Sequence, residues 1–201
     1  MKPILKLFSY IFHPLFTSVY VSVYYFYFNK EIFTLYSIFY FLTQVILLTI
    51  VLPLIMLYAL ISLRIITDVM VTNIKHRRFL LAAQCVYFFI LCFHSLKPIK
   101  NFEIQYFFIG ALSSTICALL AALFNKKVSL HMIGISGMAC FLIGLSIKTT
   151  YPSLVLTCLV ILLTGFVASS RLAMKAHTPS ELIWGTCIGI LSQVYLFNLW
   201  L

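Results

Sequence analysis

Seven long apolar stretches alternate with short polar segments along the chain. Most of them approach or exceed the roughly 18 residues that a helix needs to cross a bilayer, and none alternates strictly as a strand does. Backbone groups in hydrocarbon must be paired within the protein, which favours helices for runs of this length. The pattern therefore predicts an all-α, polytopic transmembrane helical bundle with these stretches: Ile4 to Phe28, Ile32 to Leu63, Phe79 to Leu96, Phe102 to Phe124, Val128 to Ile147, Tyr151 to Ala168 and Leu182 to Leu201.

The first stretch differs from the others because polar residues interrupt it. Lys6 and the pair His13-Pro14 lie inside this N-terminal hydrophobic segment, residues 4–28. A charged side chain in mid-membrane is costly, so the segment either crosses the membrane or lies in its interface. We therefore expect six or seven spans, in a single integral-membrane domain that covers residues 1–201.

Composition excludes a water-soluble globule. Hydrophobic residues make up 63% of the 201 positions and charged residues 9%, against about 25% charged residues in a soluble domain. The six cysteines all lie in apolar stretches and form no Cys-x-x-Cys pair. They are expected to be small buried apolar residues rather than disulfides or metal ligands.

Positive charge dominates, with 14 Lys and Arg against 4 Asp and Glu. These cations lie mostly in short segments between apolar stretches, where anionic lipids explain them without a nucleic-acid partner. If all seven stretches cross, ten cations share one side and four the other, which favours a cytoplasmic location for the richer side. Cations that bind a phosphate would bias that count, so the sidedness stays open, with a slight preference for the periplasm.

Three polar segments on the cation-rich side contain most of the chemistry. They include three of the five histidines and seven of the fourteen cations, in the segments Lys75–Arg78, Lys126–His131 and Ser170–Glu181. Two imidazoles among cations suit a phosphate ester. The cations neutralise the phosphoryl oxygens, one imidazole attacks phosphorus, and the other protonates the leaving alkoxide.

The last of these segments resembles the third signature of the type 2 phosphatidic acid phosphatase (PAP2) superfamily. That signature is Ser-Arg, five residues, His, three residues, Asp, and commonly Gly four residues later. Here it matches Ser170-Arg171, His177 and Gly185, with Glu181 in place of Asp. The second signature, Pro-Ser-Gly-His, is similar to Val128-Ser129-Leu130-His131, while the first, Lys with six residues before Arg-Pro, is not recognisable. The whole chain resembles short, divergent members of the superfamily from Bacteroidetes-type bacteria.

The resemblance implies a PAP2-like core and a metal-independent lipid phosphatase that needs no cofactor. His177 would be the nucleophile, Glu181 would hold its tautomer, and His131 would be the general acid. The implied substrates are polyprenyl diphosphate, phosphatidic acid, phosphatidylglycerol phosphate or lipid A phosphate, in a bacterial inner membrane. The residues expected to bind phosphate are Lys127, Ser129, Ser170, Arg171 and Arg78. Of these, Lys127 and Arg78 are the candidates to replace the missing first signature.

Several of these residues have simpler interpretations. Thr178-Pro179-Ser180-Glu181 has the pattern of a capping box, so Glu181 is expected to cap a helix, to orient His177, or to do both. Arg171 with Lys175, and the run Lys75–Arg78, are also typical of membrane-edge anchors. His13 and His94 have no charged neighbours in sequence and are expected to be interface or packing residues. The alternative functions are a catalytically degenerate lipid-binding or transport protein, and a small scaffold subunit.

Overall fold

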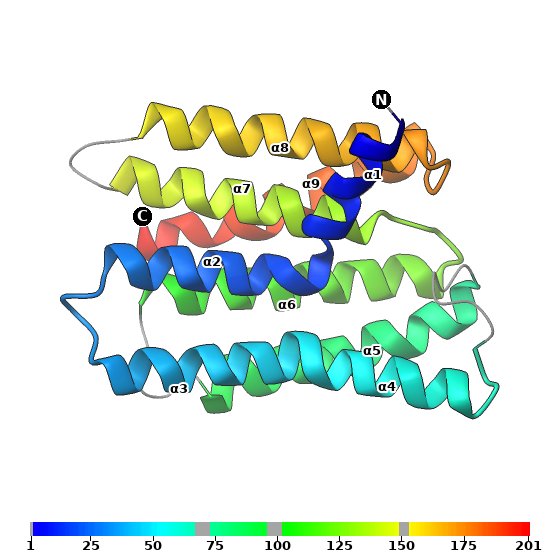
Figure 1. Ribbon diagram of the computed structural model, residues 1–201, viewed down its shortest axis with the longest axis horizontal. Helices are drawn as coiled ribbons and strands as arrows, with labels where there is room; N and C mark the ends of the chain where they lie inside the picture. Colours follow the sequence, from blue (N-terminus) through cyan, green and yellow to red (C-terminus); the bar gives the residue numbers. More distant parts are fainter. Residues whose placement is uncertain (1, 67–72, 96–101, 149–152) are drawn as a thin grey trace. The chain divides into compact units, whose positions relative to one another are not determined.

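The computed structural model describes residues 2–66, 73–95, 102–148 and 153–201, and within those ranges it is helical, without strands (Figure 1). The elements are α1 Lys2–Ile11, α2 Pro14–Phe28, α3 Leu35–Ile46, η1 Leu47–Val51, α4 Leu52–Ser62, α5 Ile74–Ile90, η2 Leu91–Ser95, α6 Glu103–Leu123, α7 Leu130–Lys148, α8 Leu154–Ala173 and α9 Pro179–Trp200. Both η elements are single π-helical turns that continue a neighbouring α-helix.

Six helical segments of the described chain are long and apolar enough to cross a membrane. They are Leu35–Ser62, Ile74–Ser95, Glu103–Leu123, Leu130–Lys148, Leu154–Ala173 and Pro179–Trp200. They coincide with the last six predicted stretches. The predicted helical bundle is therefore confirmed, and the chain is a polytopic membrane protein.

The first predicted stretch is two helices rather than one. The chain leaves the helix at Phe12 and His13 and resumes it at Pro14, the first residue of α2. Proline suits a first helical position because its missing N–H has no partner there, and it disfavours helix at the residue before it. His13 Nδ1 accepts a hydrogen bond of 3.3 Å from the Leu15 backbone N–H and so caps α2.

Two differences from the predicted boundaries concern polar residues. The run Lys75–Arg78, expected in a loop, forms the first turn of α5, where the Asn73 side chain accepts a hydrogen bond from Lys75 N. Ser170 and Arg171 likewise belong to the last turn of α8 rather than to the segment after it. In both places the helix extends beyond the apolar run into polar sequence. Its end is set by capping hydrogen bonds and not by the change from apolar to polar residues.

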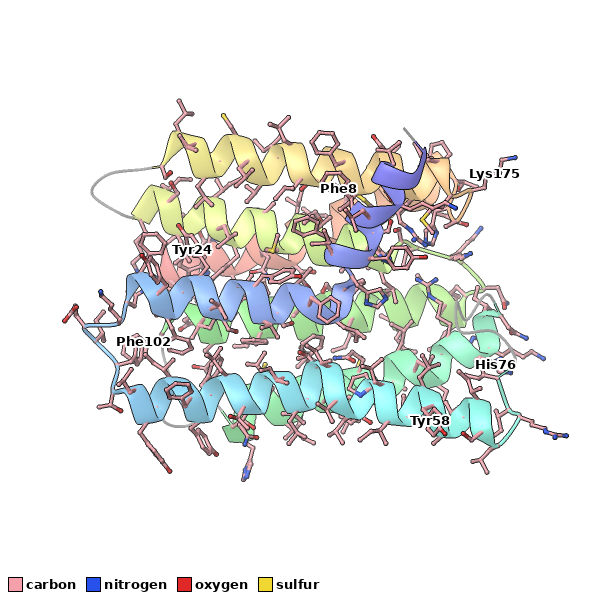
Figure 2. All side chains as sticks on the ribbon, viewed as in Figure 1. Phe8, Tyr24, Tyr58, His76, Phe102 and Lys175 are labelled. Atoms are coloured by element: carbon pink, nitrogen blue, oxygen red, sulfur yellow. The ribbon has the colours of Figure 1, made fainter. Side chains whose placement is uncertain are left out.

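The described residues form two compact units. One consists of residues 1–21 and 128–201 and the other of residues 22–127. In the first unit, α7 packs against both α8 and α9, and α1 lies on α8 (Figure 1). Phe8 of α1 stacks on Phe166 of α8 with a centroid distance of 4.8 Å (Figure 2 labels Phe8). In the second unit, α5 packs against α6 and α4.

Glycines permit a close contact between α7 and α9. A Cβ on Gly185 would lie 2.6 Å from the carbonyl oxygen of Ser129, and one on Gly189 would lie 2.6 Å from that of Ile133. Neither backbone oxygen has room for a methyl group, so the two glycines permit the close approach of these helices. The contact fixes the start of α9 beside the start of α7.

All six cysteines are free thiols, in agreement with the absence of predicted disulfides. The expectation that they are buried is wrong for three of them. Cys117, Cys158 and Cys187 are exposed on the helices, whereas Cys92 is buried. In a bilayer an exposed residue of a spanning helix faces lipid, which is as apolar as the interior of the bundle. An apolar stretch therefore does not show which of its residues are buried and which are exposed.

Candidate anion-binding site

The segments that resemble the second and third signatures meet at the N-termini of α7 and α9. Ser129 N donates a hydrogen bond of 3.1 Å to the carbonyl oxygen of Glu181. The Ser129 hydroxyl, fully buried, caps α7 by accepting from Met132 N at 3.4 Å. Ser129 therefore links the start of α7 to the start of α9. Its hydroxyl already accepts a hydrogen bond from the backbone of α7.

His177 and Glu181 are joined by a hydrogen bond in which Nδ1 of the ring lies 2.6 Å from Oε2 of the carboxylate. The side chain of His177 is 5% exposed. A carboxylate at Nδ1 favours the neutral tautomer with the proton on that nitrogen and the lone pair on Nε2. This is the tautomer that a nucleophilic imidazole requires.

Glu181 also caps α9. Its Oε2 accepts from the Thr178 backbone N–H at 3.4 Å, and its own N–H donates to Thr178 Oγ1 at 3.3 Å. The two roles predicted as alternatives for Glu181 therefore coexist. The capping box fixes the carboxylate, and the carboxylate fixes His177.

His131 lies in the first turn of α7 and contacts the end of α1. Its Nε2 is 3.2 Å from the carbonyl oxygen of Ser9. That carbonyl is available because the last four C=O groups of a helix lack partners within it, and α1 ends at Ile11. His131 is also near enough to Arg171, His13 and His177 for their charges to act on it. Both predicted catalytic histidines therefore belong to one polar cluster in the first unit.

Ser170 is fully buried and pairs with Ser9. Their hydroxyl oxygens are 2.7 Å apart, across 161 positions of sequence. With the His131 contact, Ser9 is bonded through both its hydroxyl and its carbonyl. The N-terminal helix is therefore part of the wall of the cluster.

Arg171 is the least satisfied charged group of the cluster. The residue is 7% exposed, its Nη1 contacts the sulfur of Met174 at 3.8 Å, and its buried Nε has no hydrogen-bond partner in the part of the chain that the structure describes. No acidic side chain of the described residues pairs with it. A buried cation without a counter-charge is costly, and a bound anion removes that cost.

The end of α8 holds Arg171 and leads the chain to His177. Lys175 has φ of 53°, Ala176 N bonds to Arg171 O at 3.1 Å, and Lys175 N bonds to Leu172 O at 2.9 Å. These are the two bonds of a Schellman motif with a lysine at the left-handed position. The side chain of Lys175 is exposed at this turn (Figure 2).

His13 is the residue that sequence reasoning missed. Its ring packs edge-to-face on His131 with centroids 5.0 Å apart. Burial, and then the charge of Arg171, lower the pKa of His13 below its ordinary value. His13 is thus a packing residue, which is one of its two expected roles, but it also lies where the charge of Arg171 acts on it, which its sequence neighbours did not indicate. The available signal was a histidine that interrupts an apolar stretch.

Two predicted phosphate ligands lie in the other unit. Arg78 donates from Nε to Ala122 O at 3.0 Å and from Nη2 to Asn125 Oδ1 at 2.8 Å. It thus satisfies the end of α6, where Asn125 has φ of 57°. Lys127 is the last residue of this unit. Their assignment to phosphate stays a prediction.

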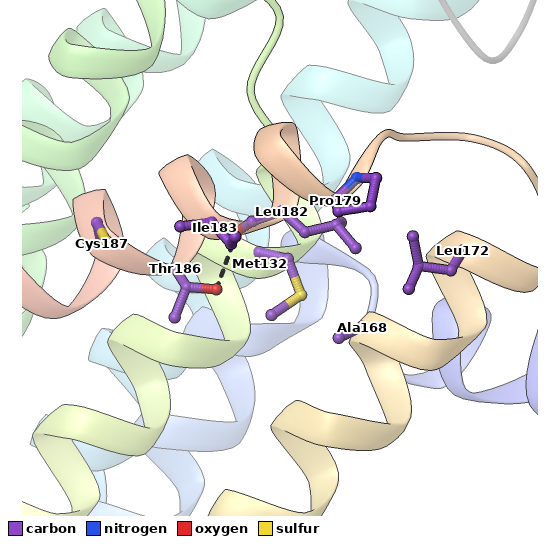
Figure 3. A pocket seen from close by; sticks show the side chains of 8 residues that line it. All are labelled: Met132, Ala168, Leu172, Pro179, Leu182, Ile183, Thr186 and Cys187. Atoms are coloured by element: carbon purple, nitrogen blue, oxygen red, sulfur yellow. Dashed lines mark hydrogen bonds between the residues drawn. The ribbon is translucent and has the colours of Figure 1, made fainter.

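An apolar cavity of about 330 Å³ lies among α7, α8 and α9 in the first unit (Figure 3). Leu172 and Leu182, which line it, directly follow Arg171 and Glu181 in the sequence. Its one hydroxyl, that of Thr186, is bonded to Leu182 O at 2.9 Å. The full lining is Met132, Ala168, Leu172, Pro179, Leu182, Ile183, Thr186 and Cys187.

No family model, curated protein or solved structure matches this chain.

Proposed function

We propose that the protein is a metal-independent phosphatase of the PAP2 type in a bacterial inner membrane. It hydrolyses a phosphate monoester or diphosphate of a lipid through a phosphohistidine. The observation that carries the proposal is the contact of 2.6 Å between Glu181 and His177, whose side chain is 5% exposed, in the same cluster as an arginine with no acidic partner among the described residues. A tautomer-fixed imidazole beside an uncompensated guanidinium is a nucleophile next to an anion site.

In the first step, His177 Nε2 attacks phosphorus while Glu181 holds the proton on Nδ1. The bond between phosphorus and the lipid oxygen breaks, and Arg171 neutralises the phosphoryl oxygens as their charge redistributes. His131 gives a proton to the departing oxygen, and the negative charge of the bound phosphate favours the protonated imidazole that this role requires.

In the second step, water attacks the phosphoimidazole. The nitrogen–phosphorus bond breaks, inorganic phosphate leaves, and His131 returns to its protonated form by taking the proton of the attacking water. His177 is regenerated with its proton on Nδ1. Each turnover thus consumes one water and releases one lipid alcohol and one phosphate.

The apolar cavity supports a lipid rather than a soluble phosphate ester. Its lining is almost wholly hydrocarbon, and two of its residues adjoin Arg171 and Glu181 in the chain. An acyl or prenyl chain gains about 25 cal/mol for each Å² removed from water. The candidate substrates are polyprenyl diphosphate, phosphatidic acid, phosphatidylglycerol phosphate and lipid A phosphate.

Phosphate release from these four lipids, by protein purified in detergent, tests the proposal. We expect His177→Ala to abolish release and His131→Ala to lower it about 10²- to 10⁴-fold. His94→Ala is the matched control, since His94 is exposed and lies in the other unit, and it should behave as wild type. Equal release by wild type and His177→Ala would remove the enzyme hypothesis.

One observation favours the second candidate, a degenerate lipid-phosphate binder or transporter. His131 Nε2 is bonded to the Ser9 carbonyl. This contact suits an imidazole that is only held in place as well as one that delivers a proton. Saturable binding of a lipid phosphate that Arg171→Ala abolishes, without release of phosphate from any of the four lipids, would favour this candidate.

A further inference from the structure

The corner between α1 and α2 supplies a third imidazole to the cluster. Because Nδ1 of His13 accepts the hydrogen bond from Leu15 N, the proton of the neutral ring is on Nε2. The neutral form is the relevant one, since burial and Arg171 lower the pKa of His13. The ring therefore presents an N–H donor at its far end and no positive charge.

The corner that holds His13 is docked firmly on the rest of its unit. Ser9 bonds to Ser170 and His131 on one side of the corner. On the other side, Thr17 Oγ1 lies 3.3 Å from the position of a Cβ on Gly134 and also bonds to Pro14 O at 2.8 Å. The imidazole is thus fixed by contacts before and after it, and its edge-to-face contact with His131 sets its orientation within the cluster.

A neutral donor suits this place for an electrostatic reason. Arg171 already places one buried guanidinium here, whose Nε has no hydrogen-bond partner among the described residues, and a second fixed cation beside it would be repelled. An imidazole N–H adds a hydrogen bond to an anion without adding to that repulsion.

We propose that His13 is an anion-binding residue, which donates a hydrogen bond from Nε2–H to an oxygen of the phosphoryl group held by Arg171. The inference rests on the proposed function only for the identity of the anion. The alternative is that His13 does no more than cap α2.

Two substitutions separate these roles. His13→Asn keeps a short side-chain oxygen in reach of Leu15 N but has no group at the position of Nε2. His13→Gln places an N–H donor near the position of Nε2 and gives up the cap. The probe is orthovanadate, a phosphate analogue, titrated calorimetrically into the full-length protein in detergent, with His94→Asn as the matched control.

We expect His13→Asn to weaken orthovanadate binding roughly 10- to 100-fold, the weight of one hydrogen bond to a charged group. His13→Gln should recover part of the affinity, and His94→Asn should equal wild type. Unchanged binding by His13→Asn overturns the inference, and so does an equal loss in both His13 variants, since that assigns the effect to the shape of the corner.

If either variant fails to fold, ¹⁵N NMR of histidine-labelled wild type decides the question. The inference requires the His13 Nε2–H signal to shift on adding orthovanadate, and an unmoved signal overturns it. Binding through His13 without any turnover removes the proposed enzyme and keeps the inference. If His13→Asn leaves both turnover and binding as in wild type, the inference is overturned and the proposed enzyme stands. If wild type does not bind orthovanadate, the enzyme hypothesis and the inference are both overturned.

Discussion

Two arginines near helix ends, one in each unit, show how the same side chain serves different purposes. Arg78 donates to Ala122 O, Leu123 O and Asn125 Oδ1 and so satisfies the last turn of α6. Arg171 lies in the last turn of α8 and is 7% exposed, and the one hydrogen-bond acceptor of its guanidinium among the described residues is the sulfur of Met174. Since both were predicted to bind phosphate, the useful distinction lies in what each guanidinium already contacts.

The contrast assigns opposite roles in stability. Removing Arg78 leaves carbonyl groups at a helix end without their donor, whereas removing Arg171 leaves no described oxygen without a partner. A buried charge kept without a counter-charge indicates a ligand, because an apolar residue would be cheaper for the fold. We therefore expect Arg171 to serve the proposed function and Arg78 to serve the structure.

The largest expected effect comes from substituting the two arginines, which tests this contrast directly. Arg171→Met should lower turnover by about 10³-fold or more, as expected for an arginine that stabilises phosphoryl transfer, without lowering the melting temperature of the ligand-free protein. Arg78→Met should leave turnover within about threefold of wild type and cost roughly 1–3 kcal/mol of stability. Thermal unfolding and lipid-phosphate release on both variants provide the measurement. A destabilised Arg171→Met with normal turnover would reverse the assignment.

A second contrast lies within Glu181. Glu181→Gln retains a side-chain acceptor for the capping box but loses the carboxylate at His177 Nδ1, so we expect turnover to fall about 10²- to 10⁴-fold with little change in stability. Thr178→Ala is the matched variant, and it should cost about 1 kcal/mol of stability and little activity. Comparable activity losses in the two would show that helix capping, and not the tautomer, is what matters.

The contact between α7 and α9 gives the next effect. Gly185→Ala places a methyl group against the Ser129 carbonyl, and we expect it to cost about 1–3 kcal/mol by overpacking and to displace the start of α9. Gly165→Ala is the control, because nothing lies within 4 Å of its Cβ position. Melting temperatures of the two variants test this; the account is contradicted if they match.

The smallest effect concerns the turn after α8. Lys175 adopts φ of 53°, a conformation that costs a non-glycine residue about 1 kcal/mol. Lys175→Gly should therefore stabilise the turn by up to that amount and leave turnover unchanged, since the lysine side chain is exposed. A large loss of activity in a thermal and kinetic comparison would instead make Lys175 a member of the site.

The spans were predictable because hydrocarbon leaves the backbone few alternatives. Six of the seven stretches are single spanning segments, and even Pro53 is accommodated, by the π-helical turn over Leu47–Val51 just before it. The resemblance implied the pairing of His177 with Glu181, and because the two residues are only four positions apart, the turn and cap at the start of α9 bring them together.

The contributions of the N-terminal segment were not predictable in the same way. Ser9 reaches Ser170 and His131 across 161 and 122 positions, and no local pattern encodes where a ten-residue helix docks. The interruption at His13-Pro14 marked the segment as unusual without naming its partners. Ser129 shows the converse, since its engagement in the backbone is visible only once α7 and α9 are packed.

The most direct test of the central claim is rapid chemical quenching of wild-type protein during turnover of a lipid phosphate, followed by mass spectrometry under alkaline conditions that preserve phosphohistidine. The account predicts a transient phosphate on His177, absent from His177→Ala. Turnover with no phosphate on His177 at any quench time, or with phosphate on another residue, would contradict it.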